Sequence, residues 1–199
     1  RPAKGRYRQF FQAGAELVGV NEPSADAEII EMAYRFISNL GIEGVGVRLN
    51  TLGDESTRPK LRQALVDYFS SYKKDLCGDC NRRLEVNPLR ILDCKKDSCG
   101  DIAKNAPSVL DFLGEDATSK FDDLKTFLDR YEVPYEVVPT MVRGLDYYTS
   151  TIFEIQVNTD TLGAQSAVLG GGRYDNLVKQ LGGRDTPSIG FSFGIERLL

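Results

Sequence analysis

The segment with the clearest strand pattern covers residues 135–193 and reads YEVVPTMVRGLDYYTSTIFEIQVNTDTLGAQSAVLGGGRYDNLVKQLGGRDTPSIGFSF. Its apolar and β-branched runs predict four strands. These lie at Tyr135–Val138, Ile152–Val157, Ser166–Leu169 and Ile189–Phe193. Short turns separate the strands more often than helices do, and short turns join antiparallel neighbours. We therefore expect an α+β fold, with a mainly antiparallel sheet flanked by helices.

The beginning of the chain adds a further extended segment, Tyr7–Val20, in which alternate side chains share a face. A helix then begins at Pro23, with Ser24 as its cap, and a short strand covers Val45–Leu49. A polar row opposite an apolar row in the extended segment is typical of a sheet with one face packed on the core and the other face open to solvent or ligand. The polar row is Arg6, Arg8, Phe10, Gln12 and Glu16, and the apolar row is Tyr7, Phe11, Ala15 and Leu17.

From about Asp54 to Tyr131 the pattern changes from strands to helices. Apolar residues recur at helical spacing in three stripes, and charged residues cluster around them. The stripes are Leu61 to Phe69, Val109 to Leu113, and Phe121 to Leu128. We expect residues 54–131 to form a small helical insertion domain. It would divide the sheet-containing core into residues 1–53 and residues 132–199.

The four cysteines of the chain all lie in this helical segment. Cys77 and Cys80 form a Cys-x-x-Cys pair, which is typical of half a zinc site, and Cys94 and Cys99 form a looser second pair. A zinc site with four thiolates is one interpretation of this spacing. The alternative is four reduced thiols without a metal. A disulfide framework is not expected, because the sequence shows no secretory context.

The composition restricts the classes of function. The formal net charge is −4, which argues against a globally basic nucleic-acid binder. The sequence has no apolar run long enough to span a bilayer and no signal peptide, so we expect a cytoplasmic protein with no membrane partner. It begins with Arg1 instead of a methionine, and we expect it to be part of a longer protein.

The chain contains no histidine. This excludes Ser-His-Asp and Cys-His catalysis, and also zinc sites of the His-Glu-x-x-His type. Any chemistry has to rely on carboxylates, arginines, tyrosines, bound ions or the positioning of substrates.

Three glycine-bearing segments carry candidate functional residues: Arg143–Thr149, Gly170–Asp175 and Gly190–Arg197. The first two place an arginine beside glycine and tyrosine. A guanidinium binds phosphates or carboxylates with two parallel hydrogen bonds, and a tyrosine supplies a ring and a hydroxyl. Gly170–Asp175 is interpreted as a strand running into a helix at about Tyr174–Leu181, where free glycine N–H groups attract anions. It lacks the order of a dinucleotide-binding loop or a P-loop, and the structural alternative is a tight turn.

Together and in this order, these segments resemble the histidyl-tRNA synthetases, a family of class II aminoacyl-tRNA synthetases. Arg1–Phe10 resembles the later part of the motif 2 loop, and Gly190–Arg197 resembles motif 3. Arg143–Tyr148 and Gly171–Asp175 resemble the two histidine-specific signatures, and Asn87–Asp93 resembles a stretch of the family's insertion domain. The resemblance covers essentially the whole chain.

The resemblance implies a binding site for histidine. Glu16 and Tyr148 would hold the imidazole, with the carboxylate accepting its N–H. Gln12 would hold the amino-acid end, Tyr174 would close the pocket, and Tyr147 belongs to the same signature. Such a site rejects analogues without the ring nitrogens, because its polar groups would be left unpaired.

The resemblance also implies a site for ATP. Arg143 would lie on the α-phosphate as the catalytic residue, where charge builds up during attack by the histidine carboxylate. Arg197 would brace the ATP, Arg6 would contact the outer phosphates, and Mg²⁺ would bridge these phosphates. No general base is required, because a carboxylate is already nucleophilic.

The implied reaction forms histidyl-adenylate from L-histidine and ATP and then transfers histidine to tRNA(His). The implied full-length protein is a homodimer. Several family parts are missing here, among them motif 1 and the anticodon-binding domain, so we expect this chain alone to be inactive. The alternatives are the family's regulatory paralogue in histidine biosynthesis and a different class II synthetase. Gln12, Glu16, Arg143 and Tyr148 favour the histidine enzyme over both.

Overall fold

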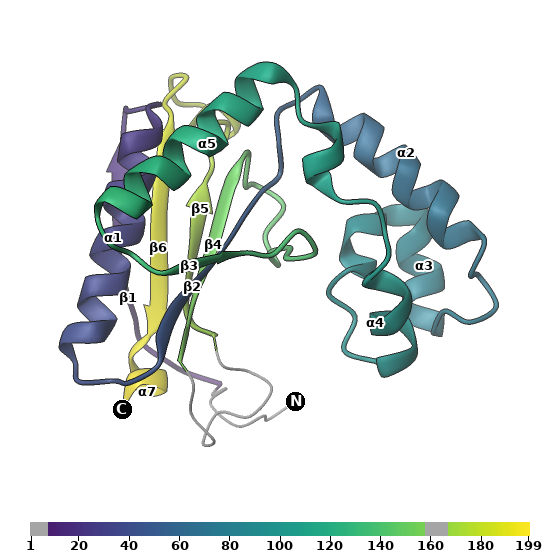
Figure 1. Ribbon diagram of the computed structural model, residues 1–199, viewed down its shortest axis with the longest axis horizontal. Helices are drawn as coiled ribbons and strands as arrows, with labels where there is room; N and C mark the ends of the chain where they lie inside the picture. The colour runs from purple at the N-terminus through teal and green to yellow at the C-terminus, as the bar shows by residue number, and fades with distance from the viewer. Residues whose placement is uncertain (1–7, 158–166) are drawn as a thin grey trace.

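The computed structural model of the chain describes residues 8–157 and 167–199. A six-stranded sheet with the order β1-β6-β5-β4-β2-β3 forms its centre (Figure 1). Arg6, which the family resemblance places on the ATP phosphates, lies outside the described residues. The strands are β1 (Gln12–Val18), β2 (Val45–Thr51), β3 (Tyr135–Val137), β4 (Thr151–Val157), β5 (Ala167–Arg173) and β6 (Ser188–Gly194).

Four of the five strand pairs are antiparallel, and β2 with β3 is the parallel pair. The helical segment of the chain connects β2 to β3, which provides the long crossover that parallel neighbours need. The expectation of an α+β fold with a mainly antiparallel sheet is thus confirmed.

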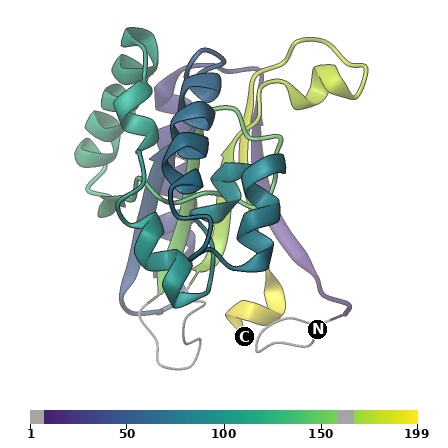
Figure 2. The ribbon, with the colours of Figure 1, turned by 90° about the vertical axis from the view of Figure 1, so that its right-hand side faces the viewer.

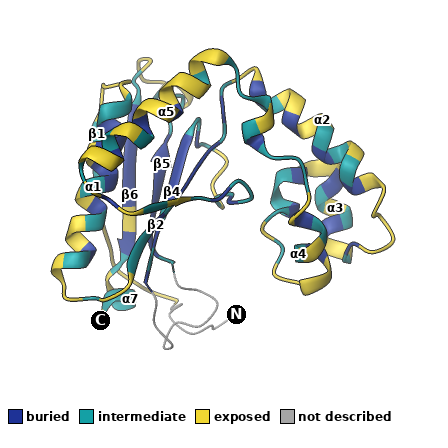
Figure 3. Ribbon diagram, viewed as in Figure 1, coloured by how far each residue is buried: buried dark blue, intermediate teal, exposed yellow. Residues whose placement is uncertain are grey.

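Two long helices, α1 (Pro23–Asn39) and α5 (Glu115–Arg130), cover one face of the sheet (Figure 1). They pack with that face into the main hydrophobic core, and most of the sheet is buried (Figure 3). Helix α1 begins after Glu22, and Ser24 is not its cap; Pro23 occupies the first helical position, where its fixed φ suits the helix. The fully buried core residues from the strands include Leu49, Phe153, Ile155 and Ile189.

A second unit of helices lies on the other side of the sheet, away from α1 and α5 (Figures 1 and 2). It has its own apolar cluster, which includes Leu61, Leu65, Phe69 and Ile91. Its elements are α2 (Thr57–Ser70), α3 (Gly78–Val86), η1 (Pro88–Ile91), α4 (Asp97–Ala103) and η2 (Val109–Phe112).

Helix α5 differs from the sequence-based expectation, which placed it in the insertion domain. Its buried residues Phe121, Leu124 and Leu128 belong to the main core, where they pack with α1 and the sheet. A helical stripe in the sequence shows that a face is buried, but it does not show against which partner. We therefore propose residues 54–114 as the insertion unit and assign α5 to the core.

The glycine-rich segment also differs from its expected structure. Strand β5 continues through the three glycines to Arg173, and the short helix α6 covers only Leu177–Gln180. Helix α7 (Ile195–Leu198) follows β6 directly. The glycines at 170–172 thus lie inside the sheet, where they determine the shape of its surface.

Candidate active site on the open face of the sheet

The face of the sheet opposite α1 and α5 is lined by glycines where β5 and β6 meet. In the strand register, Gly170 pairs with Ser192 and Gly172 pairs with Gly190. Gly190 in turn pairs with Glu16 on β1. Because side chains alternate along a strand, these residues share one face, and Phe153 and Phe191 lie on the other. The centre of the open face therefore carries almost no side chains of its own.

Three predicted site residues occupy the space that the glycines leave. A Cβ atom at Gly170 would lie 2.2 Å from Nη2 of Arg143, and one at Gly172 would lie 2.8 Å from Cδ1 of Tyr148. A Cβ atom at Gly190 would lie 1.6 Å from a carboxylate oxygen of Glu16. The glycines thus form the floor on which Glu16, Tyr148 and Arg143 converge from distant parts of the chain.

The tyrosines of the two signatures form a cluster beside Glu16. The Tyr174 hydroxyl donates a hydrogen bond to the Glu16 carboxylate. The ring of Tyr147 contacts both neighbours, with centroids 4.9 Å from Tyr148 and 5.8 Å from Tyr174. Burial raises the pKa of Tyr148 to about 12 and, together with Glu16, also raises the pKa of Tyr174. Both hydroxyls therefore stay protonated near neutral pH and can donate hydrogen bonds.

Arg143 forms an ion pair with Glu154, a half-buried residue of β4. Its Nε is buried and has no hydrogen-bond partner among the described residues. The guanidinium therefore keeps donor capacity while Glu154 fixes its position, a suitable arrangement for binding an anion.

Arg143 also lines a cavity of about 620 Å³ that extends along the open face. Gln12 and Arg197 line the same cavity, so the structure brings three predicted ligand contacts together. Gln12 extends from β1 and donates to Ser192 at 3.5 Å. Arg48 and Lys95 add positive charge to the lining. Adjoining the Glu16–tyrosine cluster, this cavity can hold a polyanion next to a small polar group.

Arg48 and Glu154 were missed by the sequence analysis. They are a paired position of β2 and β4, and both lie on the cavity side. The sequence did contain a signal for them, because each is the one charged residue of its strand, and charged residues rarely face a core.

The three glycines do not present free N–H groups to an anion, contrary to the expectation from sequence. Strand β5 lies between β4 and β6, so its backbone is paired on both sides. The contribution of the glycines is steric: they admit side chains and a ligand close to the sheet.

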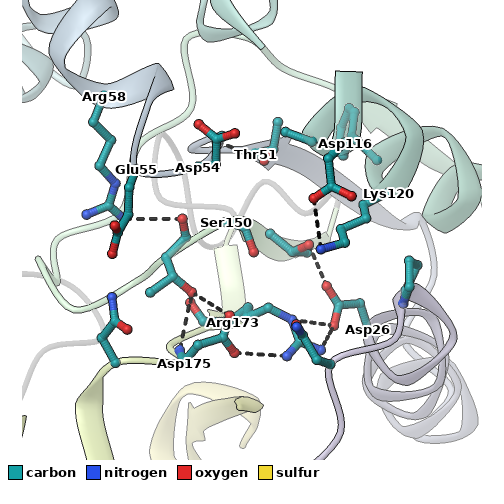
Figure 4. Close-up of a pocket in the computed structure, with 18 residues that line it drawn as sticks. Asp26, Thr51, Asp54, Glu55, Arg58, Asp116, Lys120, Ser150, Arg173 and Asp175 are labelled. Atoms are coloured by element: carbon teal, nitrogen blue, oxygen red, sulfur yellow. Dashed lines mark hydrogen bonds and ion pairs between the residues drawn. The ribbon is translucent and has the colours of Figure 1, made fainter. Parts of the chain in front are cut away.

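Arg173 is directed away from the open face. It lies in a second cavity, of about 280 Å³, and forms ion pairs with Asp26 of α1 and with Asp175 (Figure 4). Burial raises the pKa of Asp26, and its bonds to Arg173 and Thr151 oppose that shift. Burial alone would lower the pKa of Arg173, but Asp26 and Asp175 raise it. Arg173 therefore joins α1 to the sheet, and its guanidinium is already paired with carboxylates of the protein.

The insertion unit holds the Arg143–Tyr148 segment from outside. Nη2 of Arg90 donates to the carbonyl of Gly144 at 2.7 Å and lies 3.3 Å from Oδ1 of Asp146. Nη2 of Arg58 donates to the carbonyls of Tyr148 and Thr149. These two arginines were not predicted, because nothing local in the sequence indicates which backbone carbonyls they reach.

The four cysteines come together in the insertion unit. Their Sγ atoms all lie within 4.8 Å of one another. Cys80 and Cys99 are buried, and Cys77 and Cys94 are half-buried. The sequence spacing thus corresponds to a single cluster in space.

The chain is thus an α+β protein with a cavity on the open, glycine-lined face of its sheet. The sequence profile described as histidyl-tRNA synthetase matches residues 1–74 and 85–198. The chain belongs to the histidyl-tRNA synthetase family.

Individual relatives agree with this assignment. The chain is 52% identical over 199 residues to a histidine–tRNA ligase of Acholeplasma laidlawii and 47% identical to that of Bacillus subtilis. It spans all of its own length in both alignments but 47% of each relative. Among solved structures, it resembles apo histidyl-tRNA synthetase of S. aureus, with a TM-score of 0.76 and 35% identity, over 96% of this chain and 46% of that one. In the described part of the chain, no helix has the length and apolar character to cross a membrane.

Proposed function

We propose that this chain is the central part of the catalytic core of a histidine–tRNA ligase, which activates L-histidine with ATP and transfers it to tRNA(His). The observation that carries the proposal is the placement of Glu16, Tyr148 and Arg143 on neighbouring glycines of one sheet face. A ring-nitrogen donor and a phosphate bound there would be adjacent. Because the chain spans about half the length of its relatives, the activity is proposed for the longer protein.

The histidine side chain fits the cluster of Glu16 and the tyrosines. The Glu16 carboxylate accepts hydrogen bonds only, so it suits an imidazole N–H. The Tyr148 hydroxyl, protonated near neutral pH, can donate to a ring nitrogen. Tyr147 and Tyr174 complete the wall beside it. Gln12 extends toward the other end of the site, where the amino acid's polar group would lie.

The chemical step needs no base from the protein. A carboxylate oxygen of histidine attacks the α-phosphorus, the bond to the β-phosphate oxygen breaks, and pyrophosphate leaves. Arg143 stabilises the charge on the α-phosphate in the transition state, because its guanidinium is fixed by Glu154 before the substrates react. Arg197, in the same cavity, contacts the nucleotide, and Arg6 is proposed for the outer phosphates.

A magnesium ion held mainly by ATP phosphates fits the composition of the cavity. Oxygen ligands are what Mg²⁺ prefers, and the lining contains the carboxylates of Asp93 and Glu154. The ion would neutralise phosphate charge. We propose the homodimer for the longer protein on the family resemblance, and sedimentation of that protein tests it.

ATP–pyrophosphate exchange by the full-length protein tests the function. We expect exchange that depends on L-histidine and on no other amino acid. Exchange that follows a different amino acid would identify another synthetase. Absence of exchange in folded, full-length protein would favour the regulatory paralogue and overturn the proposal.

A further inference from the structure

The cysteine cluster connects the small elements of the insertion unit. Cys77 precedes α3 and Cys80 lies within it, Cys94 follows η1, and Cys99 lies in α4. These are all four cysteines of the chain, and they span only residues 77–99. Packing alone does not explain why all four thiols of this chain gather at one point, since a small apolar residue would serve that purpose.

The spacing of the sulfur atoms suits a tetrahedral metal. Four thiolates about 2.3 Å from a zinc ion lie about 3.8 Å from one another. The sulfurs of Cys77 and Cys94 are 4.0 Å apart, and all four fall within 4.8 Å. The backbone N–H of Cys77 donates to the sulfur of Cys99 at 3.3 Å. Such a bond supports a sulfur that carries negative charge.

The insertion unit has only a small hydrophobic core of its own. Its helices α3 and α4 have 9 and 7 residues, which is too short to be stable alone. Its buried cluster contains ten residues, and two of them are Cys80 and Cys99. Small units with a limited core are commonly stabilised by a bound metal or by disulfides.

We propose that Cys77, Cys80, Cys94 and Cys99 bind one zinc ion as four thiolates. Each thiol releases its proton to solvent on binding, and no oxidation occurs. Soft thiolate ligands in a tetrahedral set select zinc over magnesium or calcium. With four protein ligands the site is closed, so the ion is structural.

The zinc ion also fixes one wall of the candidate active site. Cys94 lies between Asp93 and Lys95, and both neighbours line the cavity that contains Arg143. Arg90, in η1 and four residues before Cys94, donates to the carbonyl of Gly144. Loss of the metal would therefore loosen both the cavity wall and the Arg143–Tyr148 segment.

The test measures metal in full-length protein purified without chelators. We expect about one zinc ion per chain, and thiols that resist a thiol-specific reagent until the metal is removed. Removal by a strong chelator should lower the thermal midpoint of the insertion by roughly 10 °C, and added zinc should restore it. These readouts do not depend on histidine activation, so they separate this proposal from the proposed function.

A matched pair of variants completes the test. Cys80→Ser should lose most of the zinc, whereas Ser98→Ala, an exposed position beside Cys99, should keep it. If Cys80→Ser does not fold, chelation of the unmodified protein still decides the question. Folded, metal-free protein with four reactive thiols and no response to zinc would overturn the proposal, as would stoichiometric iron in place of zinc.

Discussion

The two faces of the central sheet are built from the same strands and have opposite characters. On β5, Gly171 contacts Phe153 on the helix-covered face, whereas Gly170 and Gly172 contact Arg143 and Tyr148 on the open face. The alternation of side chains along a strand thus directs neighbouring residues of β5 either to the hydrophobic core or to the proposed ligand site. Gly171 therefore serves packing, whereas Gly170 and Gly172 leave space for Arg143 and Tyr148.

The largest effect should come from removing the Arg143 guanidinium from the open face. Arg143→Ala should lower the maximal rate of histidine-dependent exchange about 10²–10³-fold, because the charge on the α-phosphate loses its partner. Histidine affinity should change far less. Exchange at saturating substrates, with histidine binding measured separately, checks this, and Glu154→Gln shows how much depends on the ion pair. A defect limited to affinity would contradict the assigned role.

Replacing neighbouring glycines by alanine should separate the two faces: one substitution should mainly reduce stability, and the other should mainly slow exchange. At Gly171 a Cβ would lie 2.4 Å from the carbonyl oxygen of Gly190 and 2.6 Å from the Phe153 ring. Gly171→Ala should therefore lower the free energy of unfolding by about 1–3 kcal/mol. At Gly170 the three atoms nearest a Cβ all belong to the Arg143 guanidinium, at the end of a long side chain. Gly170→Ala should displace that group from Glu154, which lowers stability less than Gly171→Ala does and slows exchange.

Urea denaturation and exchange, measured on both variants, check this pair. Equal losses of stability at the two positions would mean that the faces are not independent.

The open face should also respond to alkali. The pKa of Tyr148 is about 12 in the folded protein against an ordinary value of 10.0. A raised pKa stabilises the folded state fully below pH 10, and this contribution is lost as the pH rises through 12. Tyr148→Phe should remove about 2 kcal/mol of this pH dependence.

Unfolding free energies measured at about pH 9 and about pH 12 test this, since most of the titration falls between them. Tyr34→Phe, on the helical side of the sheet, is the control. An identical pH dependence in the wild type and in Tyr148→Phe would refute the buried-phenol interpretation.

The smallest effect should come from removing Arg90 of the insertion unit, which supports the Arg143–Tyr148 segment. Arg90→Ala should slow exchange roughly fivefold, about 1 kcal/mol, because the Gly144 carbonyl loses its donor. The stability of the main core should not change. Arg82→Ala removes an exposed ion pair with Asp79 in the same unit and should leave the exchange rate unaltered. Equal effects of the two substitutions would contradict a positioning role for Arg90.

Much of this organisation could be predicted from the sequence, because it depends on local patterns. The alternation of polar and apolar residues predicted the strands, and it placed Gln12 and Glu16 on the opposite face from Ala15 and Leu17. Ordered motifs indicated the family, which the profile match confirmed. The roles of the individual site residues stay predictions.

The features that the sequence did not reveal depend on long-range contacts. Helix α5 packs on α1, which is distant in the sequence, and helical periodicity does not identify the element on which a helix packs. The extension of β5 through its glycines depends on pairing with β4 and β6, which compensates for the poor strand propensity of glycine. Arg173 and Arg143 both stand beside glycine and tyrosine in the sequence. The structural role of Arg173 depends on its contact with Asp26, which is distant in the sequence.

The most direct test is a crystal structure of the full-length protein with a stable analogue of histidyl-adenylate. The imidazole should lie between Glu16 and Tyr148, above Gly172 and Gly190, with the phosphate group beside Arg143. An analogue bound instead in the Arg173 cavity, or with its imidazole remote from Glu16, would refute the proposed histidine site.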